Sequence, residues 1–504
     1  MQYDHAHPVC SGQNASPRQS KLLARADAYI SQRAGMVEQV FRHTYHAMPP
    51  VGWMNDPNGL CYALGKYHVF YQFHPYAAAW GPMHWGHYTS NDLIRWELQP
   101  TALAPDCAYD KDGCFSGSAI VKDGMLYLMY TAVADGKQTQ ALARSSDGVH
   151  FEKMGQVIAE KDIPRDYSVA DFRDPYVFLR NGAYYCLIGS KHVDGDGAVL
   201  LYCSDDLLQW RYVGRAWKDG RTHNGTYECP AFATFGNVDA LFVCPQFMDC
   251  DGDRYENIHS NLYMLGKLDL QTGEFRRTAE CETDGGFDFY AAQTLTLPDG
   301  RTVMTAWMQM WDRSFPTAPH GWVGALTLPR ELTYRDGKLF QAPVREIEAY
   351  RTDRVSYPQA EVDGTLRLDG VEGNTIELSF DLDLGASARA GVKVFCGDGC
   401  EVSIYYDRTK ELVCFDRLHM GTLIKAAPGE HDSVLRRAHI RAEGGRLHFR
   451  IFLDVSSCEV FLGGGEQVLT GNVYSAGKGI EFFSEGGKAF VRNVEKYTIN
   501  VPRT

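Results

Sequence analysis

The sequence lacks any apolar run long enough to cross a bilayer, which excludes a protein held by membrane-spanning helices. Its first residues, MQYDHAHPVCSGQNASPRQS, have no apolar core of the length that a signal peptide needs. Basic residues are in the minority: 50 Lys and Arg stand against 63 Asp and Glu, the formal net charge is -13, and no basic block appears. We therefore expect a cytoplasmic protein with no membrane and no nucleic-acid partner.

A set of metal ligands is also missing. The 14 cysteines are scattered from Cys10 to Cys458, and without an export signal the simplest interpretation is reduced thiols in a cytosol. Cys396 and Cys400 form one close pair (CGDGC), but no second pair or nearby His completes four ligands, so zinc is disfavoured. We expect no metal and no organic cofactor.

Helical sequence is scarce, whereas aromatic strand-like runs recur. Residues 18–40 combine good helix formers with apolar side chains at helical spacing. After them, aromatic-rich runs return roughly every 55–65 residues, most with a turn signal just before, as in a repeated multi-stranded blade. The runs occupy residues 67–71, 125–130, 184–188, 240–244 and 302–307.

A second repeat lies between these runs and has the form Ser-x-Asp, three residues, then an aromatic. It occurs at residues 90–96, 145–151 and 204–210. We interpret it as a turn that closes one blade and begins its last strand, with a structural role. Five such units predict a five-bladed β-propeller, which avoids exposed sheet edges by radial repetition.

From about residue 345 the pattern changes to alternating apolar and polar residues with Gly-rich turns, which is typical of a β-sandwich. The chain of 504 residues is long enough for more than one domain. We therefore predict an all-β protein with a helical extension at 1–40, a propeller catalytic domain at 41–340 and a β-sandwich domain at 345–504.

Three acidic motifs carry the candidate chemistry, and each falls in a different repeat: Asn55-Asp56-Pro57-Asn58, Asp171-Phe172-Arg173-Asp174-Pro175 and Tyr227-Glu228-Cys229-Pro230. Each motif alone fits a turn that bends the chain before Pro. A propeller gathers equivalent positions of successive blades around its axis, so we expect the three acids to converge. Neighbouring carboxyls repel, which raises at least one pKa, and two carboxyls with divided pKa values are what glycoside cleavage needs.

The residues around the acids suit a sugar. Arg173 is expected to help keep the neighbouring Asp174 ionised and to hydrogen-bond the substrate. Flat apolar faces and neutral hydrogen-bonding groups are both available near the motifs. The first kind comprises Trp53, Trp80, Trp85 and Phe115, and the second comprises Asn55, Gln72 and Ser116.

GWMNDPNG, FRDP and YECP, in this order and spacing, resemble the three signature motifs of the β-fructofuranosidases of glycoside hydrolase family 32. The resemblance covers most of the chain. It extends to FSGS at 115–118, DFYAAQ at 288–293, GWVGALTLPRE at 321–331 and DVSSCEVF at 454–461.

The resemblance implies a five-bladed propeller followed by a β-sandwich, with Asp56 as nucleophile, Glu228 as acid/base and Asp174 as transition-state stabiliser. It implies retention through a fructosyl-enzyme, with the carboxyls of Asp56 and Glu228 roughly 5–5.5 Å apart. The expected substrates are sucrose, sucrose 6-phosphate or short fructo-oligosaccharides. The expected substrate-binding residues are Trp53, Asn55, Gln72, Trp80, Phe115, Ser116, Arg173 and Tyr290, with Asp288 evenly balanced between the site and the core.

Several alternatives stay open at this point. His74 stands where the family usually has Asn, and either substrate contact or a structural hydrogen bond fits it. Lys218, Arg221 and His223 could form a basic rim for a phosphorylated substrate or an ordinary solvated loop. The chain could transfer fructose to a sugar instead of water, or be an inactive sugar-binding propeller, and the sequence leaves open whether it forms a homo-oligomer.

Overall fold

The computed structural model describes residues 17–430 and 432–502, so Cys10 and the start of the predicted extension lie outside the described residues. Within the described part, the chain is all-β apart from one α-helix and four short 3-10 segments. The α-helix is α1 (Pro17–Arg33), and the 3-10 segments are η1 (Ala34–Met36), η2 (Glu160–Asp162), η3 (Ala318–His320) and η4 (Arg345–Tyr350). None of the described helices has both the length and the apolar character needed to cross a membrane.

The helix is shorter than predicted. It ends at Arg33 and not near residue 40, and the chain is extended by Val37. Tertiary contacts explain the early end: Val37 is buried against the first sheet, and the Glu38 backbone N–H donates to the His320 carbonyl. These contacts hold the segment in an extended course that helix propensity alone does not reveal.

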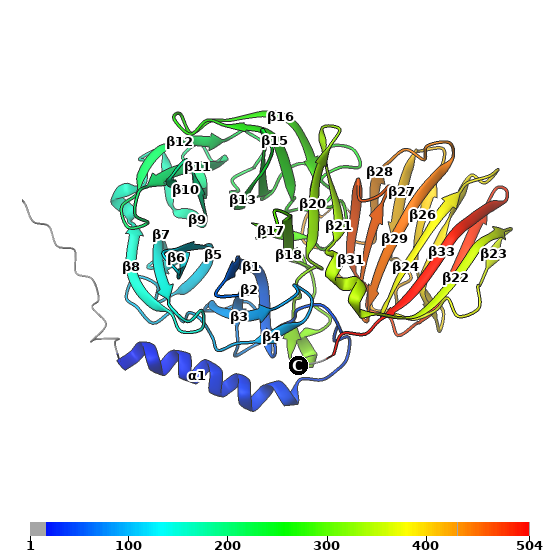
Figure 1. The fold of residues 1–504 in the computed structure, drawn as a ribbon, viewed down its shortest axis with the longest axis horizontal. Helices are drawn as coiled ribbons and strands as arrows, with labels where there is room; N and C mark the ends of the chain where they lie inside the picture. Colours follow the sequence, from blue (N-terminus) through cyan, green and yellow to red (C-terminus); the bar gives the residue numbers. More distant parts are fainter. Residues whose placement is uncertain (1–16, 431, 503–504) are drawn as a thin grey trace, which may run out of the picture.

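Five antiparallel sheets follow one another along the chain as far as residue 343 (Figure 1). The first contains β1 (Gly52–Ala63), β2 (Lys66–His74), β3 (His84–Ser90) and β4 (Trp96–Leu98), and the second β5 (Gly113–Lys122), β6 (Met125–Ala134), β7 (Lys137–Ser145) and β8 (Glu152–Ile158). The third contains β9 (Tyr167–Arg180), β10 (Ala183–His192), β11 (Gly197–Ser204) and β12 (Arg211–Trp217). The fourth contains β13 (Tyr227–Phe235), β14 (Val238–Pro245), β15 (Leu262–Leu268) and β16 (Phe275–Glu282), and the fifth β17 (Tyr290–Thr296), β18 (Thr302–Trp307), β20 (Arg330–Arg335) and β21 (Lys338–Pro343).

Both sequence repeats are confirmed as structural units. The five aromatic runs lie in β2, β6, β10, β14 and β18, which are the second strands of the five sheets. Each Ser-x-Asp turn joins the third strand to the fourth. In the first of these turns, the Asp92 Oδ1 accepts hydrogen bonds from the Ser90 hydroxyl and from the backbone N–H groups of Ile94 and Arg95. The Asp therefore has the structural role that the repeat indicates.

The first strands of the five sheets form a closed ring. β1, β5, β9, β13 and β17 contact one another in succession, and β17 also contacts β1. A short parallel pairing strengthens this closure, because β19 (Trp322–Val323), from the fifth sheet's connection, adds to the edge of β1. Figure 1 shows the five sheets around a common centre.

Each of these first strands has a break in its pairing register. The breaks lie between Met54 and Pro57, Phe115 and Gly117, Arg173 and Tyr176, Glu228 and Ala231, and Tyr290 and Gln293. Such bulges re-aim side chains, and they are among the few places where a sheet tolerates Pro. The three acidic motifs therefore do not form turns between strands: they lie inside β1, β9 and β13. The bend that each Pro indicates is a bulge within the strand.

The rest of the described chain forms two six-stranded sheets, here called the C-terminal sheet pair. Their aromatic side chains meet between the sheets, where the Phe380 ring stacks on Phe449 and contacts the edge of Phe482 at a centroid distance of 5.1 Å. One sheet contains β22 (Arg351–Val362), β33 (Ala489–Ile499), β24 (Ile376–Asp383), β29 (Arg446–Asp454), β30 (Ser457–Leu462) and β31 (Gln467–Asn472). The other contains β23 (Thr365–Leu366), β32 (Gly479–Glu485), β25 (Arg389–Gly397), β26 (Cys400–Asp407), β27 (Leu412–Asp416) and β28 (Leu435–His439).

A network of fully buried charged side chains joins the C-terminal sheet pair to the rest of the chain. His46 donates through Nδ1 to Asp454 at 2.9 Å and through Nε2 to Glu459 at 2.9 Å. Arg330, on β20, in turn bridges Glu459 at 2.7 Å and Asp284 at 2.9 Å. We call these five residues the interface network.

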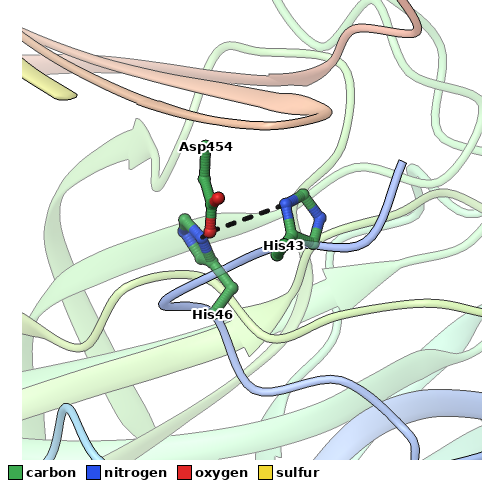
Figure 2. Close-up of side chains that lie close together, drawn as sticks. All are labelled: His43, His46 and Asp454. Carbon is green, nitrogen blue, oxygen red and sulfur yellow. Dashed lines mark hydrogen bonds and ion pairs between the residues drawn. The ribbon is translucent and has the colours of Figure 1, made fainter. Parts of the chain in front are cut away.

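Two histidines, His43 and His46, lie beside Asp454 (Figure 2), and they differ in charge at neutral pH. Burial alone lowers the pKa of His46, but its hydrogen bonds to Asp454 and Glu459 outweigh burial and raise the pKa to about 9. His43 Nδ1 lies 3.8 Å from the same carboxylate, and burial lowers its pKa to about 3. His46 is therefore an imidazolium at neutral pH and His43 a neutral ring.

Candidate active site

The three predicted catalytic acids line one cavity of about 450 Å³ inside the ring of first strands. Asp56 comes from β1, Asp174 from β9 and Glu228 from β13. The bulges place these side chains in the cavity, and two of the residues there have left-handed backbones: φ is 63° at Asp174 and 48° at Cys229. Non-glycine residues rarely hold this conformation, which is typical of functional sites in which the surroundings over-determine the backbone.

Asp56 is held by hydrogen bonds on both of its carboxylate oxygens. Its Oδ2 accepts from the Ser116 hydroxyl at 2.5 Å, and its Oδ1 accepts from the Asn55 amide at 3.1 Å. The Cys229 thiol lies 3.5 Å from Oδ2. Burial raises the pKa of Asp56 and the nearby charge of Glu228 adds to this, while the three hydrogen bonds oppose it. The result is a fixed, poorly solvated carboxyl.

Glu228 is bound on both oxygens by groups from other strands. Oε1 accepts from Arg173 at 3.0 Å, and Oε2 accepts from the Tyr290 hydroxyl at 2.6 Å. These partners come from β9 and β17, the two neighbours of β13 in the ring. The carboxyl is therefore oriented by three strands at once.

The pKa of Asp174 is strongly raised. Burial, the charge of Glu228 and the charge of Asp56 all raise its pKa, whereas Arg173 and the Cys229 backbone N–H lower it, and the pKa is about 7. The expectation that at least one carboxyl has a raised pKa is confirmed. Arg173 lowers the pKa of Asp174 and so favours its ionised form, as expected, but burial and two like charges outweigh one guanidinium.

Arg173 has its hydrogen-bond partners elsewhere. Besides Glu228, it donates to the Thr226 hydroxyl at 2.8 Å, to Gln138 at 3.2 Å and to Asp171 at 3.4 Å. Most of its N–H groups are thus bound to other protein groups, so its main effect is to fix the position of the Glu228 carboxyl.

The structure divides the predicted substrate-binding residues into two groups. Asn55, Gln72, Trp80, Phe115, Ser116 and Arg173 line the cavity with the three acids. Trp80 is 53% exposed and meets Phe115 edge to face, so the two rings form one wall that is open to solvent.

Trp53 and Tyr290 lie behind the lining and touch it. The Trp53 indole donates to the Asn55 side chain at 2.7 Å and stacks on Trp311. Trp85, also expected to offer a face to the sugar, is buried in the core, and its indole donates to the Phe115 carbonyl.

Residues that the sequence analysis missed complete the cavity. Most of them come from connections between strands, where no acid–Pro motif marks them, while Gln138 lies on the third strand β7 and Ala170 and Asp171 lie on the first strand β9. These additional lining residues are Gln138, Ala170, Asp171, Gln246, Phe247, His259, Trp311 and Asp312. Asp171 alone carried a signal, since it belongs to the second acidic motif.

The structure favours structural roles for the basic residues before Glu228 and for His74. Lys218 pairs with Asp194 at 2.7 Å, Arg221 with Glu280 at 2.7 Å and His223 with Asp249 at 2.7 Å, and none of the three lines the cavity. His74 also lies outside the lining, and its Nδ1 donates to the Ala79 carbonyl at 2.8 Å.

Asp288 belongs to the junction between the sheets and not to the cavity lining. Its carboxylate accepts from Arg313 at 3.1 Å and from Arg417 at 2.7 Å. Arg417 follows β27 of the C-terminal sheet pair, so Asp288 connects this pair to the segment that precedes β17.

Comparisons with known proteins identify the family of this chain. Residues 46–343 match the model of the glycosyl hydrolases family 32 N-terminal domain, and residues 346–500 match that of the glycosyl hydrolases family 32 C terminal. Together the two matches cover most of the chain and confirm the family to which the motifs are similar.

Individual relatives are similar over nearly their full length. The chain is 36% identical to a sucrose-6-phosphate hydrolase of Zymomonas mobilis, covering 89% of each protein. It is 36% identical to a raffinose invertase of Escherichia coli, covering 85% of this chain and 89% of the relative. Among solved structures, the GH32 beta-fructofuranosidase of Bombyx mori superposes with a TM-score of 0.81 at 32% identity, covering 95% of this chain and 98% of that one.

Proposed function

This chain belongs to family 32 of the glycosyl hydrolases, and from this premise we propose how its three acids divide the work. The chain is a glycosidase that hydrolyses β-D-fructofuranosides, as its relatives do. The observation that carries the proposal is the convergence of Asp56, Asp174 and Glu228 in one cavity, where burial and mutual repulsion raise the pKa values of the two aspartates.

Asp56 is proposed as the nucleophile. It would attack C2 of the fructosyl unit and form a fructosyl-enzyme. Its hydrogen bonds to Ser116 and Asn55 fix the carboxylate before the substrate arrives. Such positioning removes much of the entropic cost of bringing the reacting atoms together.

Glu228 is proposed as the acid/base. It would protonate the glycosidic oxygen as the leaving group departs and then take a proton from the water that releases fructose. Tyr290 and Arg173 hold its two oxygens and set the direction from which the proton arrives.

Asp174 is proposed to bind fructose hydroxyls. Positive charge develops on the ring in the oxocarbenium-like transition state, so a carboxylate hydrogen-bonded to those hydroxyls binds more strongly there than in the ground state. The Cys229 backbone N–H, which donates to Asp174 at 2.9 Å, anchors the carboxylate for this task.

We also infer that the five N-terminal sheets are the blades of a five-bladed β-propeller and that the C-terminal sheet pair is a β-sandwich. The ring of first strands, the closure through β19 and the Phe-lined space between the last two sheets support this. A catalytic domain over 41–340 and a sandwich over 345–504 fit the end of the fifth sheet at Pro343. Thirteen described cysteines carry free thiols, which favours a reducing, cytoplasmic location.

The proposed chemistry is tested by product analysis. Purified protein is incubated separately with sucrose, sucrose 6-phosphate, kestose and inulin, and free fructose and glucose are measured by chromatography. We expect fructose from at least one substrate. On sucrose, which yields equal amounts of the two sugars on hydrolysis, fructose well below glucose would favour transfer to sugar. A folded protein that cleaves none of the four would support the inactive sugar-binding alternative.

Retention is a separate expected result. Proton NMR of the first product should show β-fructofuranose before mutarotation, because two displacements at C2 restore the starting configuration. A crystal structure should place the carboxyls of Asp56 and Glu228 roughly 5–5.5 Å apart. A separation of about 6.5 Å or more, with the α-anomer released first, would contradict the nucleophilic role of Asp56.

Replacing Ser116 with Ala should lower kcat about tenfold and move the acid limb of kcat/KM to higher pH. The Ser116 hydroxyl stabilises the charged form of Asp56 through its 2.5 Å hydrogen bond, so its loss raises the pKa of the nucleophile. The measurement is a pH–rate profile on sucrose.

Ser118→Ala is the matched control for this variant. Ser118 lies on the same strand, but its buried hydroxyl donates to the Pro175 carbonyl and does not line the cavity. If both variants move the acid limb equally, the Ser116–Asp56 hydrogen bond does not set the ionisation of Asp56.

A further inference from the structure

The wall next to Glu228 is where the leaving group must lie if the proposed function holds, because Glu228 then protonates the oxygen that joins this group to fructose. The connection between β14 and β15 forms this wall. Gln246 accepts from Thr226, the residue that also binds Arg173, and the His259 ring lies 6.1 Å from that of Tyr290, the partner of Glu228.

Aromatic and polar groups share this wall. Phe247, 43% exposed, packs edge to face on His259 at a centroid distance of 4.9 Å, and Trp311 lines the cavity beside Asp312. Aromatic faces next to hydrogen-bonding groups are typical of sites that bind sugar rings. Asn55, Gln72 and Ser116 line the cavity as well, and because Asn55 and Ser116 bind the proposed nucleophile Asp56, we assign these three residues to fructose.

His259 has a hydrogen-bonding position left over. The residue is 2% exposed, its Nε2 lies 3.4 Å from the Asp312 carboxylate, and its buried Nδ1 has no hydrogen-bond partner among the described residues. A buried polar atom without a partner is costly. Because His259 lines the cavity, a change in the orientation of its ring on ligand binding would offer Nδ1 to a sugar hydroxyl.

The charges that line the cavity are predominantly negative. Five carboxyls lie there, and apart from His259 the only basic side chain in the described lining is Arg173, which is bonded to Glu228, Thr226, Gln138 and Asp171. Lys191, near this rim, pairs with Asp171 at 2.9 Å. The five carboxyls are those of Asp56, Asp171, Asp174, Glu228 and Asp312.

We infer that His259 and Asp312 determine leaving-group specificity and that they select an uncharged sugar over a sugar phosphate. The inference rests on the proposed function and names its substrate class: fructosides with a neutral glycosyl group, such as sucrose. A phosphate at this wall would face the Asp312 carboxylate, and the lining that the described residues form offers it no unoccupied guanidinium or ammonium group. Sugar hydroxyls, in contrast, can use His259 Nδ1 and Asp312 together.

The test compares three fructosides: sucrose, sucrose 6-phosphate and methyl β-D-fructofuranoside, whose leaving group is only methanol. The unaltered protein should show kcat/KM at least about tenfold higher on sucrose than on sucrose 6-phosphate. Asp312→Asn, which removes the repelling charge, should reduce that ratio about tenfold. Asp171→Asn removes a carboxylate of the same cavity that Lys191 already neutralises, so it should change the ratio far less.

His259→Phe tests the hydrogen bond. It should lower kcat/KM about tenfold on sucrose and much less on methyl β-D-fructofuranoside, because methanol offers no second hydroxyl to His259. Circular dichroism and thermal unfolding check that the variant is folded.

Each failure has its own signature. Faster turnover of sucrose 6-phosphate than of sucrose by the unaltered protein would overturn the inference and leave the proposed function intact. Equal losses of the His259 variant on sucrose and methyl fructoside would overturn the role of His259 at the leaving group. Cleavage of none of the three fructosides would overturn the proposed function, and the inference with it.

Discussion

Asp56→Asn should lose about 10⁴- to 10⁶-fold in kcat on sucrose while its fold and thermal stability stay close to those of the unaltered protein. The amide keeps the shape of the side chain and can still bond Ser116 and Asn55, but it cannot form the fructosyl ester. The measurement is fructose release under saturating substrate, together with circular dichroism. Asp56→Ala should be equally inactive, which separates the loss of the nucleophile from a change in its hydrogen bonds.

Asp171→Asn provides the matched control. Asp171 lines the same cavity, but its partners are Lys191, Ser168 and Arg173, and no catalytic step is assigned to it. It should lose far less activity than Asp56→Asn. An Asp56→Asn protein with more than about a tenth of the original kcat, shown by mass spectrometry to be intact, would contradict nucleophilic catalysis at this residue.

The second large effect concerns stability and arises at the interface network. Asp454→Asn should lower the free energy of unfolding by about 3–5 kcal/mol, because it leaves the His46 imidazolium buried against an amide. The carboxylate also accepts hydrogen bonds from the backbone N–H groups of Thr44 and Tyr45. The side-chain NH₂ group of Asn would face these donors and could not accept from them. Denaturant unfolding of the purified variant measures the loss.

Asp381→Asn is the control for this variant. Asp381 also bonds a histidine, His448, at 2.8 Å and lies on the same six-stranded sheet, but 41% of the His side chain and 34% of the Asp side chain are exposed. Solvent-exposed pairs contribute little, so its loss should be below about 1 kcal/mol. Equal losses of unfolding free energy at the two sites would show that burial does not make the Asp454–His46 pair more important for stability than an exposed pair.

The same network predicts a pH dependence. The folded pKa of His46 is raised to about 9, above its ordinary value of 6.5. Its contribution to stability is therefore fully present below pH 6.5 and is lost as the pH rises through 9. Between these values the unaltered protein should lose more stability than His46→Gln, and parallel pH profiles for the two proteins would contradict a buried imidazolium.

What the sequence determined by itself was local or repeated. The aromatic runs predicted β2, β6, β10, β14 and β18, because alternation and flanking turns act within a few residues. The Ser-x-Asp turns close through hydrogen bonds between residues at most a few positions apart. The three acidic motifs were also legible, since a sheet tolerates Pro at a bulge and the bulges lie where the acids are.

The tertiary structure alone decided which groups meet. Arg173 binds Glu228, 55 residues away, in preference to its neighbour Asp174, and Tyr290 reaches Glu228 across 62 residues. His259 and Asp312 enter the cavity from connections that carry no motif. The physical reason is that ring closure and burial act between segments far apart in sequence: they set the distances that raise the pKa of Asp174 and that hold His46 charged, and no local pattern encodes those distances.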